Sequence, residues 1–261
     1  MSKIRTLSFD FKAVFVWEGS MRKNLAIFIG LGVLLFGCVG PDQDSESVHL
    51  IRVAQKARNS SNPEAALSFY KKAKELDPDN AQIYLGLGEV YVDMNLLDAA
   101  VEYLKMAEDR GASPSKISYL RGKIHLLSGK PGLAEKEFSK FENEDSLNAL
   151  GAIYDKRNER EKAQRFYKRV IAKDPNYIDA YNNLGLSLLL ERKYRDAIFY
   201  LESACTFPGA NVNYRSNLAL AYGLSGNMKK AREVYAKDFE DEALEERIAN
   251  LEDIIAERQR Q

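Results

Sequence analysis

The stretch DPNYIDAYNNLGLSLLLERKYRDAIFYLESACTFPGAN, residues 174–211, decides the fold of this chain. Two apolar stripes recur within it at helical spacing. Their members are Tyr181, Leu184, Gly185 and Leu188, then Ala197, Leu201 and Ala204. Polar residues 191–193 separate the stripes, and Pro208-Gly209 ends the segment. The pattern predicts two amphipathic helices joined by a tight turn. Because neither helix can bury its stripe alone, such a unit needs stacked neighbours.

The same pattern recurs along the chain at a spacing of about 34 residues. Units begin at Ser47, Ala81, Ser115, Glu144, Ile178 and Val212. Leucine, glycine, aromatic and alanine residues return at matching offsets, and this shared set resembles the tetratricopeptide repeat (TPR). The third unit is about five residues short, just before Glu144, so we expect an irregularity there. Residues 48–261 are therefore predicted to form an all-α TPR solenoid of about six helix–turn–helix repeats.

A helix is also predicted for residues 241–261, after the last repeat. Leu244, Ile248, Leu251 and Ile255 follow helical spacing. Acidic residues dominate the first turns and arginines the last, as the helix dipole favours. We interpret this segment as a helix that caps the last repeat, with a coiled-coil dimer as the alternative.

Composition excludes several classes of function. The 261 residues carry a formal net charge of zero, which gives no nucleic-acid footprint. Two cysteines cannot form a disulfide framework. His49 and His125 have no partners at metal-ligand spacing, and no phosphate-binding or nucleophile motif is present. Cys205 is interpreted as a packing residue. We expect no enzyme activity, cofactor, metal or small-molecule substrate.

The N-terminal region reads as a targeting signal. Residues 21–37 begin with basic residues and continue with an apolar run of twelve, which is too short to span a bilayer and matches a signal peptide. The sequence from Leu35 to Cys38 resembles a bacterial lipobox. That resemblance implies cleavage before Cys38 and acylation of its side chain and amine. The alternative is a short N-terminal anchor with an incidental cysteine.

The segments on either side of this signal are also assigned. Residues 1–20 do not fit a signal and are interpreted as a gene-model extension. Residues 38–47 are expected to be the lipidated cysteine and a polar tether. Val39 is not the aspartate that retains enterobacterial lipoproteins in the inner membrane. We therefore expect an outer-membrane lipid anchor, with the domain facing the periplasm.

The repeat register predicts a partner-binding groove. In TPR domains the first helix of each pair lines a concave surface. The residues expected to face it are Gln82, Glu89, Lys116, Tyr119, Lys123, Asn148, Asp155, Asn182, Asn183, Leu186 and Asn217. Asparagine amides can donate to and accept from a peptide backbone, so a protein partner is expected. The alternative is that these residues are merely solvated.

Several short motifs narrow the resemblance to one family. They are Asn182–Gly185, Pro208–Ala210, Asn217–Ala221 and Asn250-Leu251. Together with the lipobox they are similar to TadD, the TPR lipoproteins of the tight-adherence (Flp) pilus system. The resemblance implies a periplasmic adaptor that helps to place or stabilise a secretin. Alternatives are a type IV pilus pilotin, or an envelope scaffold that recruits proteases or cell-wall hydrolases. A third alternative, an enzyme with the solenoid as its substrate arm, is disfavoured because no domain lies outside the repeats.

Overall fold

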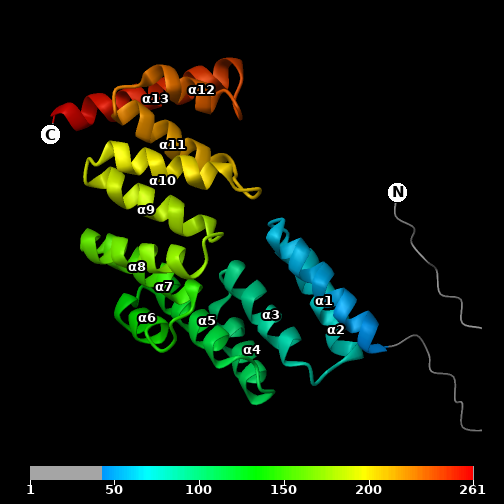
Figure 1. The fold of residues 1–261 in the computed structure, drawn as a ribbon. Helices are drawn as coiled ribbons and strands as arrows, with labels where there is room; N and C mark the ends of the chain where they lie inside the picture. The colour runs from blue at the N-terminus through cyan, green and yellow to red at the C-terminus, as the bar shows by residue number, and fades with distance from the viewer. Residues whose placement is uncertain (1–42, 261) are drawn as a thin grey trace, which may run out of the picture. The chain divides into compact units, whose positions relative to one another are not determined.

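The computed structural model describes residues 43–260, and these form helices joined by turns (Figure 1). In this described part the helices are α1 (Gln43–Asn59), α2 (Pro63–Leu76), α3 (Ala81–Asp93), α4 (Leu97–Asp109), α5 (Pro114–Leu127), α6 (Pro131–Phe138), α7 (Glu144–Lys156), α8 (Arg160–Lys173), α9 (Ile178–Leu190), α10 (Tyr194–Thr206), α11 (Val212–Leu224), α12 (Met228–Tyr235) and α13 (Asp241–Arg260). The predicted all-α repeat fold is confirmed. The segments predicted to be a gene-model extension and a signal peptide, and Cys38, lie outside the described residues.

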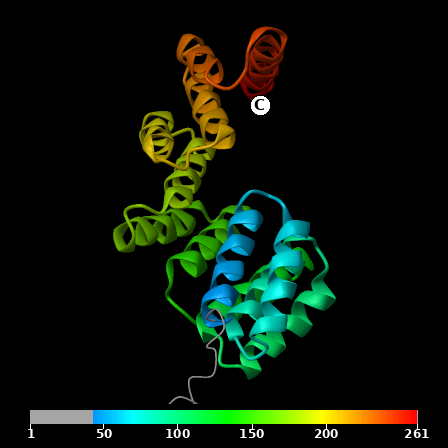
Figure 2. The same cartoon turned by 90° about the vertical axis from the view of Figure 1, so that its right-hand side faces the viewer.

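Consecutive helices pack as antiparallel pairs, and the pairs stack in chain order (Figures 1 and 2). The second helix of each pair also packs on the first helix of the next pair. First helices also touch one another within two groups, α3 with α5, and α7, α9 and α11 in succession. Helices α3, α7, α9 and α11 begin at the residues predicted to open their units, and α5 begins one residue earlier.

The turn inside each repeat depends on one residue with left-handed backbone geometry. It falls at the same offset in all six repeats, at Ser61, Asn95, Gly129, Asn158, Arg192 and Gly226. Glycine and asparagine tolerate this conformation best, so Arg192, with φ of 61°, is the least suited of the six. The second helix then begins at once, and Asn62 caps α2 through a 3.0 Å bond from the Ala65 N–H, ahead of Pro63.

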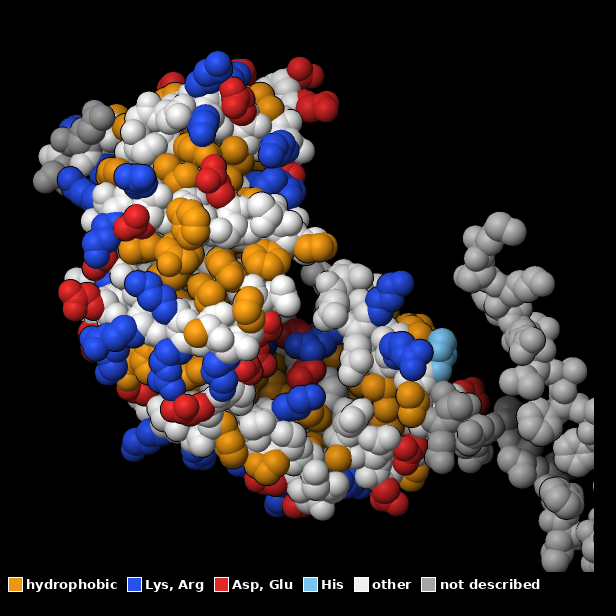
Figure 3. Space-filling view, viewed as in Figure 1, with side chains coloured by type: hydrophobic (Ala, Val, Ile, Leu, Met, Phe, Trp, Pro, Cys, Tyr) orange, Lys and Arg blue, Asp and Glu red, His pale blue; other side chains and the backbone are white. Residues whose placement is uncertain are grey.

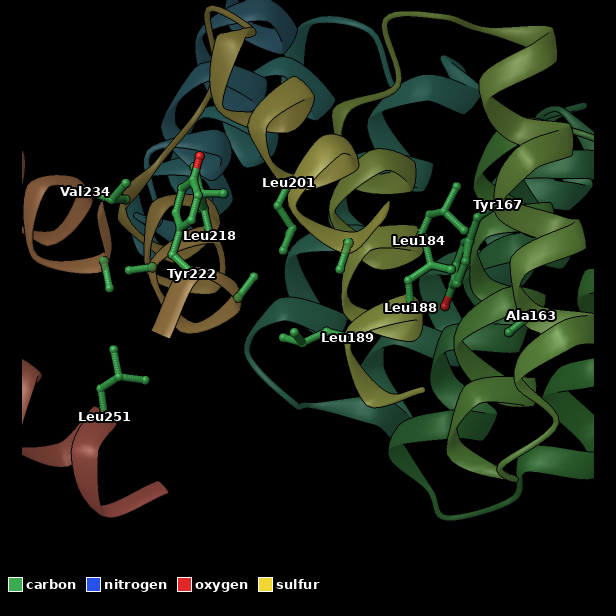
Figure 4. Close-up of a cluster of buried hydrophobic side chains, with 14 of the residues drawn as sticks. Ala163, Tyr167, Leu184, Leu188, Leu189, Leu201, Leu218, Tyr222, Val234 and Leu251 are labelled. Atoms are coloured by element: carbon green, nitrogen blue, oxygen red, sulfur yellow. The ribbon is translucent and has the colours of Figure 1, made fainter. Parts of the chain in front are cut away.

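Small residues let the two helices of a repeat approach closely. A Cβ added at Gly122 of α5 would lie 2.4 Å from a ring carbon of Phe138 on α6. One added at Gly151 of α7 would lie equally close to the ring of Tyr167 on α8. In Figure 4 the Tyr167 side chain points toward Leu184 and Leu188 of α9, which joins one repeat to the next.

The expected irregularity lies in the third repeat. Helix α6 has eight residues, whereas α8 has fourteen. The buried core is divided at the same repeat: one block extends from Ile51 to Ile124, and another extends from Ala134 to Leu251. The missing residues therefore shorten the second helix rather than a surface loop, and they interrupt the continuous packing of the solenoid.

Helix α13 caps the last repeat. Leu251 is 1% exposed and packs against Gly223 of α11. Arg258 Nη2 donates to the Leu189 carbonyl of α9 over 3.3 Å, so α13 spans two repeats. Because Ile248 and Leu251 are buried within the chain, this stripe is not available for a coiled-coil dimer. No helix of the described part is long and apolar enough to cross a membrane.

The N-terminal boundary of the domain differs from the expectation. Helix α1 begins at Gln43, so the second half of the expected tether (38–47) is helical, and Ser47 is fully buried. Glu46 lies near the start of α1, where the helix dipole favours negative charge. The polar composition that suggested a tether is equally suitable for the start of a helix.

Candidate partner-binding groove

The first helices α1, α3 and α5 bring a network of charges together at one end of the groove. Arg58 pairs with Glu89 and, at 2.5 Å, with Asp93. Lys123 Nζ lies 3.7 Å from Asp93. Glu89 and Lys123 were predicted to face the groove, but Arg58 and Asp93 were missed. Repeat register alone could have indicated Arg58, which occupies the offset of Asp155, but the first repeat lacks the glycine and tyrosine that fix the register.

Burial perturbs the acid at the centre of this network. Desolvation raises the pKa of Glu89 above its usual range, while the charges of Arg58, Lys123 and Lys116 oppose the shift. Lys116 is exposed and adds positive potential without a direct contact to Glu89. Arg58, Glu89, Asp93 and Lys123 therefore neutralise one another. Lys116 lies beside them, exposed to solvent.

Tyrosines and aspartates lie along the next part of the groove. Tyr177 donates to Asp145 over 2.7 Å, and Tyr214 donates to Asp179. Burial, followed by the charges of Asp145 and Asp179, raises the pKa of Tyr119 to about 12. Tyr119 was predicted to face the groove, and its position near these acids agrees with that register. This part of the groove is consequently acidic.

The four predicted asparagines form a hydrogen-bonded ladder across three helices. Asn217 on α11 donates to Asn182 on α9 over 2.8 Å. Asn182 donates to its neighbour Asn183 over 3.3 Å, and Asn183 donates to Asn148 on α7 over 3.1 Å. Asn182 is 8% exposed, whereas the other three are half-buried. The ladder aligns the amide groups along the groove and leaves the half-buried members accessible.

Asp155 is used within the protein. It accepts hydrogen bonds from Tyr167 over 3.0 Å and from Ser187 over 2.7 Å, and Arg160 lies 3.5 Å away. Burial raises the pKa of Asp155, while these donors oppose the shift. The structure therefore places Asp155 as a link between α7, α8 and α9.

The far end of the groove is apolar. Leu186 is half-buried on α9, and Leu190 on the same helix is 52% exposed. Figure 3 shows apolar side chains gathered over α9 to α11, above a hollow where acidic and basic side chains meet. Toward the opposite, charged end, Gln82 is exposed near the start of α3. The groove thus changes along its length from charged to amide-rich to apolar.

Nothing in this arrangement supports chemistry at a reacting atom. In the part of the chain that the structure describes, no group of histidines, cysteines or carboxylates could hold a metal ion. Cys205 is half-buried, and burial raises the pKa of its thiol, which disfavours the nucleophilic thiolate. His125 is half-buried on α5, consistent with a packing role.

Comparison with protein families agrees with this architecture. Models of the tetratricopeptide repeat match residues 57–124, 146–176 and 166–199. The chain carries tetratricopeptide repeats. A repeat array of this kind is a scaffold for protein–protein interaction.

Individual similar proteins have diverse roles. The BBSome complex member BBS4 homolog of Drosophila melanogaster is 22% identical over 66% of this chain, and the match covers 30% of that protein's length. The structure of PilW, a widely conserved type IV pilus biogenesis factor, has a TM-score of 0.60 at 17% identity, covering 76% of this chain and 96% of PilW. Pseudomonas aeruginosa PilF has a TM-score of 0.54 at 16% identity, covering 76% and 90%. At these identities the similarity shows the fold alone.

Proposed function

We propose that this TPR protein is a non-enzymatic, lipid-anchored adaptor of the bacterial outer membrane that binds a protein segment in its groove. The observation that carries the binding function is the asparagine ladder, Asn217–Asn182–Asn183–Asn148. Amides held in line by one another are ordered before a partner arrives, which lowers the entropy lost on binding. The accessible members then donate to and accept from an extended backbone.

The partner that we propose is a secretin or another component of a Flp-type pilus or secretion apparatus. The lipobox and the motifs from Asn182 to Leu251 support this choice. The extent of the structural match also supports this choice, because PilW and PilF are covered over nearly their whole chains. These two neighbours equally favour the second candidate, a pilotin for a type IV pilus secretin.

The anchor is tested by metabolic labelling with palmitate, followed by separation of inner and outer membranes. Wild type, Cys38→Ala and Cys205→Ala are compared, because the chain has only these two cysteines. We expect label and outer-membrane association in wild type and Cys205→Ala, and neither in Cys38→Ala. Retention of Cys38→Ala in the membrane would assign anchoring to the apolar segment instead.

The partner is tested through the accumulation of secretin multimers in cells. We expect deletion of the whole gene to reduce the multimers, and Asn183→Ala/Asn217→Ala to reduce them to a similar extent. Lys71→Ala, on the exposed face of α2, is the matched control and should leave them unchanged. Unchanged secretin in the deletion strain, together with co-purification of a protease or cell-wall hydrolase, would favour the envelope scaffold.

A further inference from the structure

Helix α8 presents a strongly basic face on the side of the repeats opposite the groove. Six of its fourteen residues are basic and one is acidic. Ala163, Tyr167 and Val170 are buried toward the core. The exposed basic residues are Lys162, Arg165, Lys168, Arg169 and Lys173. As a second helix of its repeat, α8 does not belong to the groove-lining set, so this surface needs an explanation of its own.

The outer face of α8 contains a recess with an aromatic floor. A hollow of about 300 Å³ is lined by Lys162, Arg165, Phe166 and Arg169. The Phe166 ring stacks on Tyr154 of α7 at 5.4 Å between centroids, with 11° between the planes. The Arg169 guanidinium lies 5.6 Å from the Phe166 ring, and Lys162 Nζ lies 3.7 Å from the Tyr154 ring. Cations therefore surround an apolar surface that is already fixed by stacking.

Part of this positive charge has no carboxylate partner. In the described part of the chain, Arg165 makes only a 3.3 Å bond to the backbone carbonyl of Glu161. A second hollow of about 560 Å³ shares Lys162 and Arg165 and also contacts Arg160. Arg160 Nη1 makes no hydrogen bond among the described residues, but it is ion-paired with Asp155 over 3.5 Å. Unsatisfied donors beside a recess favour a ligand with acceptor oxygens.

The short helix α6 leaves one end of α8 without an equivalent in the preceding repeat. Helix α6 ends at Phe138, whereas α8 continues for the equivalent of six further residues, from Lys168 to Lys173. Glu142 and Glu144, which follow α6, reach this end of α8. Glu142 accepts from Arg169 over 2.8 Å and its carbonyl accepts from Lys173, while Glu144 lies 3.7 Å from Lys173. These contacts engage Arg169 and Lys173 but not Arg165.

We propose that the outer face of α8 is a second docking site, which binds an acidic protein segment through one apolar side chain placed on Phe166. Carboxylates of the segment pair with Arg165 and Lys162. A hollow of about 300 Å³ is at the small end of binding pockets and fits a single side chain. Glu159 and Glu191 line the neighbouring hollow, so the positive surface is local, and a short protein segment fits it better than an extended anionic bilayer.

The test uses the described domain without its anchor and a short fluorescein-labelled peptide of aspartate and glutamate around one phenylalanine. Fluorescence anisotropy gives the dissociation constant at low and at physiological salt. The variant Lys162→Glu/Arg165→Glu removes the proposed cations, and acidic residues near the N-terminus of α8 are compatible with the helix dipole. Lys71→Glu/Lys72→Glu on the exposed face of α2 gives the same change of net charge elsewhere.

We expect the α8 variant to weaken binding about tenfold or more, which corresponds to about 1.4 kcal/mol, and the α2 variant to leave it within about twofold. Replacing the phenylalanine of the peptide by alanine should also weaken binding, and added salt should weaken it further. Equal effects of the two variants, indifference to the phenylalanine, or no binding would overturn the proposal. Tighter binding to phosphatidylglycerol vesicles than to the peptide would replace it with a membrane surface. Circular dichroism of each variant confirms that the helices are retained, and Asn183→Ala in the groove should have no effect.

Discussion

At the scale of single residues, the repeat is specified by small side chains where the helices cross. The sequence predicted these glycines and alanines correctly, because a recurring offset reports close packing directly. The left-handed residue in every turn was not predicted, because Ser61, Asn95 and Arg192 have chemically unrelated side chains and form no recognisable sequence pattern. Backbone geometry fixes these positions, and in two of the six, at Ser61 and Arg192, the stacked helices hold a residue other than glycine or asparagine in this conformation.

Glycine substitutions in the third repeat test the close approach of its helices. Gly122→Ala should lower the free energy of unfolding by about 1–3 kcal/mol, because the new Cβ would overlap the Phe138 ring. Gly132→Ala on α6 meets open space and should raise it by about 0.4–1 kcal/mol through the unfolded chain. Urea unfolding of both variants measures the difference. Equal stability of the two would contradict the packing described for this repeat.

The asparagine ladder makes a second prediction at this scale. Asn182→Ala should destabilise the protein by about 1–3 kcal/mol, because the amide of Asn217 would lose its acceptor in a largely buried position. Asn213→Ala, at an exposed position on the same helix as Asn217, should change stability by less than about 0.5 kcal/mol. Thermal or urea unfolding separates them. The repeat register predicts that each asparagine faces the groove. It does not predict the hydrogen bonds between them, because the bonded residues on different helices are 35 positions apart in the sequence.

At the scale of helices, the predicted pairs and their boundaries are confirmed, while the ends of the array are less predictable. The capping role of α13 followed from its single apolar stripe. The start of α1 did not follow, because acidic and polar residues suit both a tether and a first helical turn. The five missing residues of the third repeat were visible as spacing. The spacing alone did not show that these missing residues shorten α6 and not a surface loop.

The capping helix is tested by truncating side chains on its two faces. Leu251→Ala should cost about 2–5 kcal/mol, because Leu251 is 1% exposed against Gly223. Ile254→Ala, on the same helix and 46% exposed, should cost far less. The measurement is the urea midpoint of each variant, with the α-helical signal as the probe. A similar loss in both variants would mean that α13 does not pack as a cap.

At the scale of the whole molecule, buried tyrosines link stability to alkaline pH. The pKa values of Tyr70, Tyr119, Tyr214 and Tyr222 are raised to about 12, mainly by burial, and those of Tyr167 and Tyr177 are raised further. The folded protein therefore keeps protons that the unfolded chain loses near pH 10. This stabilisation is complete below pH 10 and is lost as the pH rises through about 12.

Titration of the folded protein checks this linkage. Phenolate absorbance should lag behind that of the urea-unfolded chain above pH 10, and the urea midpoint should fall over the same range. Tyr119→Phe should reduce the fall, because this side chain no longer ionises in either state. A midpoint that stays constant up to about pH 12 would contradict the burial of these tyrosines.

In the proposed function the whole molecule acts through its groove, and the repeat register predicts which residues face it but not how their chemistry changes along it. Along the groove, charged side chains are followed by asparagine amides and then by apolar side chains. This order arises because successive first helices carry different residue types at the same position of the repeat. A ligand that matches this order is an extended segment rather than a compact surface patch. Such a segment can be bound while the outer face of α8 remains free.

The most direct test of the proposed function is site-specific photo-crosslinking in cells of the source organism. The photo-reactive residue replaces Lys116 on α5, in the groove, or Lys136 on α6, which is exposed on the second helix of the same repeat. The account predicts that Lys116 yields a crosslinked band containing a secretin or another pilus component and that Lys136 does not. Crosslinks to that component from Lys136 alone, or from neither position, would contradict a partner bound in the groove.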